Sequence, residues 1–286
     1  MKLQEIDTST RFRGRLRSSV RITPEASPVE VRELRLALPG DFPAVTAGQS
    51  VGVIVPGDPE FGQREHFRLY TIADLPQRLD DGGVLIKLCV RRCDVIDPHS
   101  GERYAGRASH YLCDLAPDDC ILITGPHGDP FVVPEDAAAD LILIAAGTGI
   151  APFRAFIRRI DRDHPDFQGK IRLLHGGRTG LELLYQNEII DEFSRFGDRQ
   201  ACQALTAVAA RPHWSDRIDW SAALEPQSEP IRQALLDPHA HVYLAGTESI
   251  RDEIDRVFGK IFGGADRWTR RKAEMIAGGR WRELLY

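Results

Sequence analysis

The sequence predicts two domains, an antiparallel β-barrel followed by an α/β domain with a parallel sheet, because its hydrophobic pattern changes once along the chain. Up to about residue 134, short apolar runs alternate with turn residues, a spacing typical of many short strands in a barrel or sandwich. From about residue 138, strand-like runs alternate with helical stretches, as in a parallel sheet covered by helices. The change falls near Pro134. We therefore expect domains at residues 1–134 and 135–286.

Individual elements are expected where apolar runs end at glycine, proline or other turn residues. In the first domain we expect strands at 50–57, 67–73, 84–90 and 120–125. In the second, strands are expected at 141–145, 171–175 and 241–245, and helical stretches near 152–163, near 182–195 and from about 248.

Composition excludes several classes of protein. No apolar run approaches the roughly 20 residues that span a bilayer, and the polar first ten residues do not resemble a secretory signal, so we expect a cytoplasmic protein that does not enter membranes. A net charge of −5 gives no reason to expect nucleic acid. The five cysteines are odd in number and form no C-x-x-C pair, so we expect no disulfide framework and no metal centre, and we expect most of them to be buried.

A glycine turn follows the expected strand at 141–145. Gly147 and Gly149 let the backbone approach an anion closely, Thr148 lies between them, and the next helix begins with free amides and a favourable dipole. Pro152 suits the first helical turn but stands where the usual G-x-G-x-x-G fingerprint has its third glycine. The turn therefore predicts a pyrophosphate site of an unusual kind.

Motifs elsewhere in the chain occur in the order found in plant-type ferredoxin–NADP reductases, and the sequence resembles that family over nearly its whole length. The matching segments lie at 48–54, 68–71, 88–90, 106–109, 111–115, 123–126, 147–154 and 183–185, with a tyrosine at 286. The resemblance implies that the barrel binds FAD and that the α/β domain binds NADPH.

The segment Arg68–Thr71 carries the clearest implied chemistry. Arg68 and Tyr70 alternate with Leu69 and Thr71, so each pair shares one face of a strand. By resemblance, Arg68 binds the flavin pyrophosphate, Tyr70 stacks on the isoalloxazine, and Thr71 reaches toward flavin N5. Taken alone, the segment fits a half-exposed strand whose arginine covers apolar surface.

A second phosphate motif is implied by Gly106, Ala108 and Ser109, where a helix start offers amides and a hydroxyl to the diphosphate. Ser109 also fits a plain helix N-cap.

The strand before this motif is implied to line the flavin through its backbone, at Cys89, Val90 and Arg91. A core strand would have the same sequence. The adenine-stacking tyrosine of the family has no counterpart in residues 91–96, which leaves the adenine contact open.

Cofactor choice is implied by residues after the strands of the second domain. Arg178 follows the strand at 171–175, where a cation suits a 2′-phosphate and an NAD-specific site would carry an acid. The resemblance adds Tyr185 on the adenine side, Arg211 as a second phosphate ligand offset by one position, and Gly246 beside the nicotinamide. We expect NADPH, with NADH as the alternative.

The chain ends at Tyr286, which would ordinarily be a frayed end. By resemblance it stacks over the flavin and moves aside during hydride transfer. Two family groups are missing: Ala245 replaces a cysteine, and Leu284 replaces a glutamate. Glu283 is one position off and would point the other way. Thr71 and Tyr286 are therefore the expected catalytic residues.

The resemblance implies a monomeric FAD-dependent enzyme that exchanges hydride with NADPH and single electrons with ferredoxin or flavodoxin. Arginine-rich segments at 11–21 and 267–282 are candidates to steer an acidic carrier. An alternative is the reductase component of an oxygenase or another multicomponent system, because the sequence does not identify the electron acceptor. A third is a nucleotide-binding regulatory subunit without chemistry.

Overall fold

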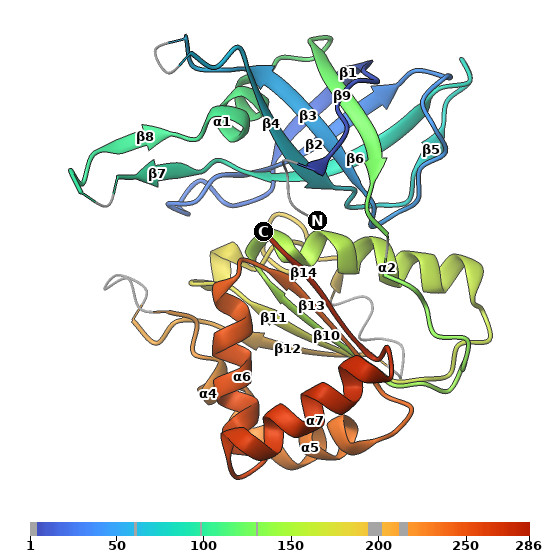
Figure 1. Ribbon diagram of the computed structural model, residues 1–286, viewed down its shortest axis with the longest axis vertical. Helices are drawn as coiled ribbons and strands as arrows, with labels where there is room; N and C mark the ends of the chain where they lie inside the picture. Colours follow the sequence, from blue (N-terminus) through green and yellow to red (C-terminus); the bar gives the residue numbers. More distant parts are fainter. Residues whose placement is uncertain (1–4, 60–61, 98, 130, 194–201, 212–216) are drawn as a thin grey trace. The chain divides into compact units, whose positions relative to one another are not determined.

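The computed structural model describes residues 5–59, 62–97, 99–129, 131–193, 202–211 and 217–286 (Figure 1). The chain forms two compact units. The first contains residues 1–130 and 154–159, and the second contains residues 131–153 and 160–286. The predicted architecture, a barrel followed by an α/β domain, is confirmed.

The first unit is built on a seven-stranded antiparallel sheet with the order β4-β3-β9-β1-β2-β6-β5. An antiparallel bridge between Ile72 and Leu88 joins the end of β4 to β6, so the sheet curls into a barrel. Its strands are β1 (Phe12–Arg21), β2 (Val31–Leu38), β3 (Ser50–Pro56), β4 (Glu65–Thr71), β5 (Gln77–Arg78), β6 (Val84–Arg91) and β9 (Cys120–His127). Between β6 and β9 the chain forms a two-stranded ribbon of β7 (Asp94–Ile96) and β8 (Arg103–Ala105), followed by helix α1 (Arg107–Asp114).

Alternation of side chains along the strands produces the barrel core. Leu34, Leu36 and Leu38 recur every second residue on β2 and are almost completely buried. Helix α1 contributes Leu112 and Cys113 to the same cluster, so the helix is fixed by burial of one face.

The second unit contains a parallel five-stranded sheet with the order β12-β11-β10-β13-β14. The strands are β10 (Leu141–Ala146), β11 (Ile171–Gly176), β12 (Cys202–Ala207), β13 (His241–Gly246) and β14 (Trp281–Leu285). The chain first adds β11 and β12 on one side of β10, then returns to place β13 on the other side. The strand order therefore reverses between β10 and β13, and ligands of open parallel sheets bind at the carboxyl ends of strands at such a switch point.

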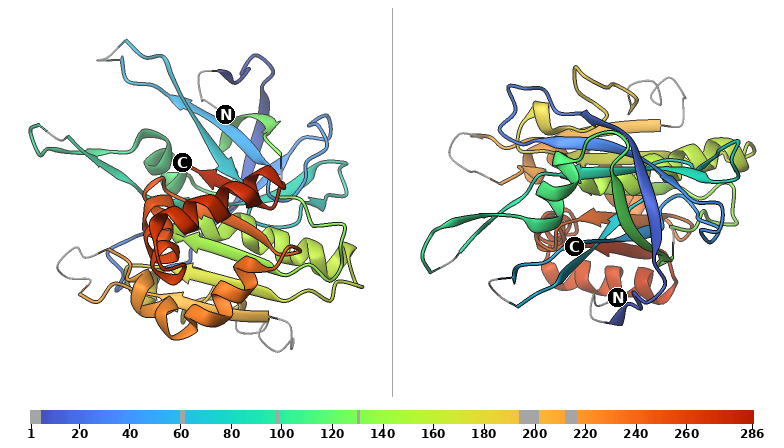
Figure 2. Two further views of the ribbon diagram at one scale, coloured as in Figure 1. Left: turned by 60° about the horizontal axis from the view of Figure 1, so that its bottom comes forward. Right: turned by 90° about the horizontal axis from the view of Figure 1, so that it is seen from above.

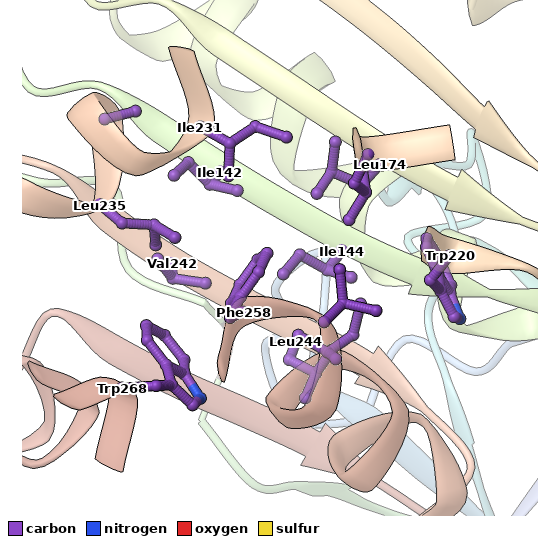
Figure 3. Packing of buried hydrophobic residues seen from close by; sticks show 14 of the residues in the cluster. Ile142, Ile144, Leu174, Trp220, Ile231, Leu235, Val242, Leu244, Phe258 and Trp268 are labelled. Atoms are coloured by element: carbon purple, nitrogen blue, oxygen red, sulfur yellow. The ribbon is translucent and has the colours of Figure 1, made fainter. Parts of the chain in front are cut away.

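Helices cover this sheet on both faces. Helix α2 (Ile150–Asp163) follows β10, and α4 (Trp220–Leu224), α5 (Ser228–Leu236), α6 (Ser249–Ile261) and α7 (Ala265–Ala277) come later. The left view of Figure 2 shows α6 and α7 as a red helical pair. Apolar residues of β10, β11 and β13 pack against the later helices, and Trp220, Phe258 and Trp268 fill the space between these helices and the strands (Figure 3).

The structure departs from the sequence predictions at several places. Residues 183–192 form turns instead of the expected helix, while 194–201 lie outside the described residues. The expected final helical segment is two helices and a closing strand, β14. Cys89 and Cys113 are buried as expected, but Cys93 and Cys120 are exposed, and nothing is described of the Cys202 side chain.

The described ranges contain neither a membrane-spanning helix nor a metal-binding cluster. No helix there is long and apolar enough to cross a membrane. No three histidine, cysteine or acidic side chains gather there in a way that could hold a metal ion.

Candidate functional site

The segment Arg68–Thr71 forms the end of β4, paired with β3. Arg68 is exposed and Tyr70 is half-buried against the barrel core. Thr71 lies opposite Ser50, and the two hydroxyl oxygens are 3.3 Å apart. Leu69 is half-buried on the Thr71 face. The alternation predicted for this strand is therefore present, with a cation and an aromatic ring on one face and a hydroxyl on the other.

The Tyr70 ring lies near helix α1. Burial raises the pKa of its phenol, and Cys93 and the α1 residue Cys113 act in the same direction. The β4 segment also contacts α1, the helix that carries the predicted diphosphate motif. On β6, Cys89 and Val90 are buried and Arg91 is exposed. These strand residues offer their backbone at the same end of the barrel, since Ile72 just beyond β4 is bridged to Leu88.

Helix α1 begins after Gly106, which is its N-cap, so the alternative interpretation of Ser109 as N-cap is wrong. Ser109 is the third helical residue, and its hydroxyl accepts from the Cys93 amide at 3.1 Å and donates to the Gly106 carbonyl at 3.1 Å. Ala108 is buried beneath the first turn. A Cβ at Gly106 would lie 2.5 Å from the Cys93 carbonyl oxygen, so only glycine lets the chain turn into the helix here.

The predicted pyrophosphate turn lies at the switch point of the parallel sheet. Gly147–Gly149 form one 3-10 turn between β10 and α2, and Gly147 has a φ of +54°. A Cβ at Gly149 would lie 2.2 Å from the carbonyl oxygen of Ala245, so this glycine lets the turn pack directly on β13. The first amides of α2 and the end of β13 at Gly246 therefore share one edge of the sheet.

Tyr286 is ordered at this same edge. Strand β14 runs parallel to β13, and the Tyr286 amide donates to the Gly246 carbonyl at 3.1 Å. The phenol shares a 2.6 Å hydrogen bond with the hydroxyl of Thr148, while 59% of the residue is exposed. The carboxyl terminus is thus attached to the glycine turn by a hydroxyl pair that solvent can reach.

The two departures from the family pattern are neighbours in space. Ala245 on β13 and Leu284 on β14 are register partners. Glu283 is held elsewhere: its carboxylate accepts from Trp281 Nε1 at 2.7 Å and from Arg251 Nε at 2.7 Å. Burial raises the pKa of Glu283, but Trp281 and Arg251 outweigh that effect and the pKa is lowered overall. Glu283 is therefore a structural anion in this arrangement.

The loops after β11 and β12 are joined to each other. The Gly177 amide donates to the Ala207 carbonyl at 3.0 Å, and the Ala209 amide donates to the Arg178 carbonyl at 3.1 Å. Arg178 is half-buried, and Arg211 is exposed two residues beyond Ala209. The backbone thus brings the two predicted phosphate-binding arginines into neighbouring loops.

Tyr185 takes a left-handed conformation with a φ of +60°, and its carbonyl accepts from the amides of Glu192 and Phe193. Its side chain is completely buried.

A pocket of about 330 Å³ beside Arg211 includes residues that sequence reasoning missed. Its lining combines Arg211, Arg217 and Arg256 with the acids Asp219 and Glu253 and with Trp220. Three arginines around one pocket suit an anion such as a phosphate. The signal available in the sequence was weak, because Arg256 lies far from Arg211 in the chain.

A buried polar group tests whether a nucleotide suits this edge. The Thr179 hydroxyl is buried and lacks a hydrogen-bond partner among the described residues. Such groups are rare in proteins and are usually satisfied by a ligand or water. The position of Thr179 after β11 suits a polar ligand at the carboxyl edge of the sheet.

The α/β unit matches the family model for the oxidoreductase NAD-binding domain over residues 143–255. The full chain is 30% identical to a ferredoxin–NADP reductase from Spirulina over 278 residues, which cover 96% of this chain and 94% of the relative. It is 29% identical to a chloroplastic leaf isozyme of ferredoxin–NADP reductase from rice, over 96% of this chain and 76% of the relative.

Among solved structures, the chain resembles ferredoxin–NADP+ reductase from Plasmodium falciparum, with a TM-score of 0.71 at 17% identity over 99% of this chain and 98% of that one. A mutant of that reductase in complex with 2′P-AMP gives a TM-score of 0.72 at 18% identity, over 98% and 97% of the two chains. Fold and site define a two-domain oxidoreductase with a nucleotide-binding parallel sheet. The chain belongs to the ferredoxin–NADP reductase family.

Proposed function

We propose that this protein is an FAD-dependent oxidoreductase that exchanges hydride with NADPH and single electrons with ferredoxin or flavodoxin. The observation that carries the proposal is the hydrogen bond between Tyr286 and Thr148, which holds an aromatic ring at the pyrophosphate turn of the switch point. A dehydrogenase that hands hydride directly to a small substrate has no need of an aromatic ring held at that turn. Family membership over nearly the whole chain supports the same conclusion.

In this proposal, residues 1–134 bind FAD and residues 135–286 bind NADPH. Arg68 and the first amides of α1, from Arg107 to Ser109, would hold the flavin diphosphate. Tyr70 would stack on the isoalloxazine, and Cys89–Arg91 would contact it through backbone groups. A bound flavin supplies the step from a two-electron donor to a one-electron acceptor. The Thr71 hydroxyl, paired with Ser50, would orient toward the reacting ring.

On the nicotinamide side, the amides of Gly147–Gly149 would hold the pyrophosphate, and Gly246 would lie beside the nicotinamide. Tyr286 would leave its bond to Thr148 when the nicotinamide enters. Ala245 and Leu284 make the adjacent strand ends apolar, so the protein supplies orientation and exclusion of water there.

NADPH is favoured over NADH because cations follow both β11 and β12. Arg178 and Arg211 lie in loops that are hydrogen-bonded to each other, and Arg217 lines the pocket beside Arg211. Guanidinium groups match the geometry of a 2′-phosphate. By family resemblance Tyr185 would lie on the adenine side, but its completely buried ring would have to become accessible before it could stack on a base.

The acidic carrier is proposed to dock on β1. Arg13, Arg15 and Arg17 alternate with buried residues, so they form one exposed row on the outer face of the barrel. Arg15 and Arg17 share one nearby carboxylate, Asp118, at 3.7 and 3.9 Å, which leaves the row with an excess of positive charge. Such a row raises the association rate of an acidic protein.

The carboxyl-terminal cations are less suited to steering. The Arg271 Nε donates to the Leu235 carbonyl at 2.8 Å, and the Lys272 ammonium lies 2.8 Å from Asp255. These side chains contribute to the packing of α7.

Stopped-flow reduction by NADPH and NADH, followed by turnover with ferredoxin, flavodoxin and oxygenase components, tests the proposal. We expect a yellow protein that NADPH reduces faster than NADH and that passes electrons to ferredoxin or flavodoxin. Turnover confined to an oxygenase component would replace the first proposal with the second. A colourless protein that binds neither nucleotide would indicate a regulatory subunit.

A further inference from the structure

A cluster of buried charged side chains lies inside the first unit and has no part in the chemistry proposed above. Its members are Glu33 on β2, Asp74 just after β4, Lys87 on β6, and Arg154 and Arg158 on the part of α2 that belongs to this unit. The side chains of Asp74 and Arg154 are each only 2% exposed. Charges buried this deeply are costly to desolvate, so they need well-formed partners.

Asp74 is the centre of this cluster. Lys87 Nζ lies 2.7 Å from its Oδ2, and Arg158 Nη1 donates to both carboxylate oxygens at 2.8 Å. Arg154 Nη1 lies 3.1 Å from the same Oδ2. Burial raises the pKa of Asp74, but the cations around it, above all Arg154, outweigh that effect and the pKa is lowered overall. Asp74 is therefore an anion held by three cations.

The cluster is attached to the backbone that follows Thr71. Arg154 Nη1 donates to the Ala73 carbonyl at 3.3 Å, and the Ala73 amide donates to the Lys87 carbonyl at 2.8 Å. Ile72, between Thr71 and Ala73, is completely buried. The residues that follow Thr71 are thus bonded to β6 through their amide and to α2 through their carbonyl.

The position of the Thr71 hydroxyl depends on this backbone. Thr71 is the last residue of β4, which lies at one end of the strand order and pairs with β3. Its hydroxyl oxygen is 3.3 Å from that of Ser50, longer than the roughly 2.5–3.0 Å of most bonds between hydroxyl groups. The contact with Ser50 is therefore weak, and the anchored residues after Thr71 fix its orientation more firmly.

Charged groups suit a positioning role better than a stabilising one. Buried ion pairs often contribute no more stability than apolar side chains of similar volume. A guanidinium fork and a carboxylate, in contrast, bond in fixed directions. We propose that Asp74 and Arg154 are positioning residues that, through Ala73, hold the Thr71 hydroxyl in the orientation that flavin reduction requires. This inference rests on the proposed function, in which Thr71 orients toward the reacting ring.

The test measures the rate of hydride transfer from saturating NADPH by stopped flow, in flavin-loaded variants of the full chain whose folding is checked by urea unfolding. Asp74→Asn removes the charge at nearly constant size. It should slow hydride transfer at least about tenfold, because a displacement of about 1 Å at a reacting group can cost about a hundredfold. Thr71→Ala should also be slow. In Thr71→Ala, the change Asp74→Asn should cause no further loss of rate, because the group that it positions is gone.

Asp140→Asn is the matched control. Asp140 accepts from Arg172 Nη1 at 2.8 Å and is also partly buried, but it lies immediately before β10 in the second unit. This variant should lose stability and keep its rate of hydride transfer. If Asp74→Asn does not fold, Arg158→Gln takes its place, because it removes the partner of Asp74 that is 32% exposed. Its rate should fall, and the fall should again disappear in Thr71→Ala.

Three results would overturn the inference. One is a folded, flavin-loaded Asp74→Asn variant that transfers hydride at the unaltered rate. Another is an equal further loss of rate in Thr71→Ala, or full activity of Thr71→Ala alone, since the cluster would then act by another route. The third is an equal loss of rate in Asp140→Asn, which would attribute the effect to stability. An unaltered chain whose flavin NADPH cannot reduce would instead overturn the proposed function itself.

Discussion

Replacing Thr148 by valine should tighten the binding of NADP+, because the hydroxyl pair with Tyr286 must be broken before the nicotinamide can enter. The hydrogen bond is 2.6 Å long, and Tyr286 is 59% exposed. A neutral hydrogen bond contributes about 0.5–1.5 kcal/mol net, and exposure favours the lower half of that range. Since about 1.4 kcal/mol corresponds to a tenfold change in affinity, Thr148→Val should lower the Kd for NADP+ about two- to fivefold.

The assay is isothermal titration of the flavin-loaded protein with NADP+ and with 2′P-AMP, which lacks the nicotinamide. Only NADP+ binding should change. Thr148→Ser keeps the hydroxyl and should behave like the unaltered protein. Tyr286→Phe should give a gain similar to that of Thr148→Val, and the double variant should add nothing further, because both changes remove the same bond.

Weaker NADP+ binding by Thr148→Val would refute this reasoning, because Thr148 would then contact the nucleotide more than it holds Tyr286. Equal effects on NADP+ and 2′P-AMP would refute it too, since the hydroxyl pair concerns only the nicotinamide end.

Four further results are expected. Gly149→Ala should weaken NADP+ binding at least about tenfold by titration, since a Cβ 2.2 Å from a backbone carbonyl forces the turn away from β13; unchanged affinity would contradict the geometry. Burial lowers the pKa of His175 from 6.5 to about 4, so between these two pH values the unfolded chain binds a proton that the folded chain does not. The free energy of unfolding, measured with urea, should therefore drop by up to about 3 kcal/mol as the pH falls from 6.5 to 4. His175→Leu should reduce this dependence of stability on pH. Glu283→Gln should lower the free energy of unfolding by about 1–3 kcal/mol, because it weakens the bond from Arg251, while the rate of hydride transfer in stopped flow changes by less than about twofold. A large loss of rate with unchanged stability would instead indicate a catalytic role for Glu283. Reversing the charges of Arg13 and Arg17 together should raise the KM for ferredoxin at low salt and leave NADPH reduction unchanged; an equal effect at high salt would exclude steering.

The parts of the fold that could be predicted from the sequence are those determined by the local pattern of apolar and turn residues. The runs that became β3, β10 and β13 are short, largely apolar stretches that end at glycine or proline, and the glycine turn after β10 carries its own signal in Gly147 and Gly149. Strand β14 was missed because Trp281–Leu285 follows a long helical pattern and gains its extended form from pairing with β13. The loop after η4 (Gly180–Glu182) was misjudged because its apolar residues are buried by the tertiary fold, which overrides helix propensity.

The candidate site shows the same division. Arg68, Thr148 and Tyr286 were found from motifs, but their partners were not, since the contact of Tyr286 with Thr148 joins residues 138 apart in the chain. The pairing of Ala245 with Leu284 likewise depends on strand register.

The most direct test of the proposed function is an anaerobic titration of the purified protein with NADPH, followed by addition of oxidised ferredoxin. We expect the yellow flavin absorbance to bleach with about one equivalent of NADPH and to return as ferredoxin is reduced. A flavin that NADPH cannot bleach, or a protein without flavin, would contradict the proposal that the glycine turn and Tyr286 serve hydride transfer between two cofactors.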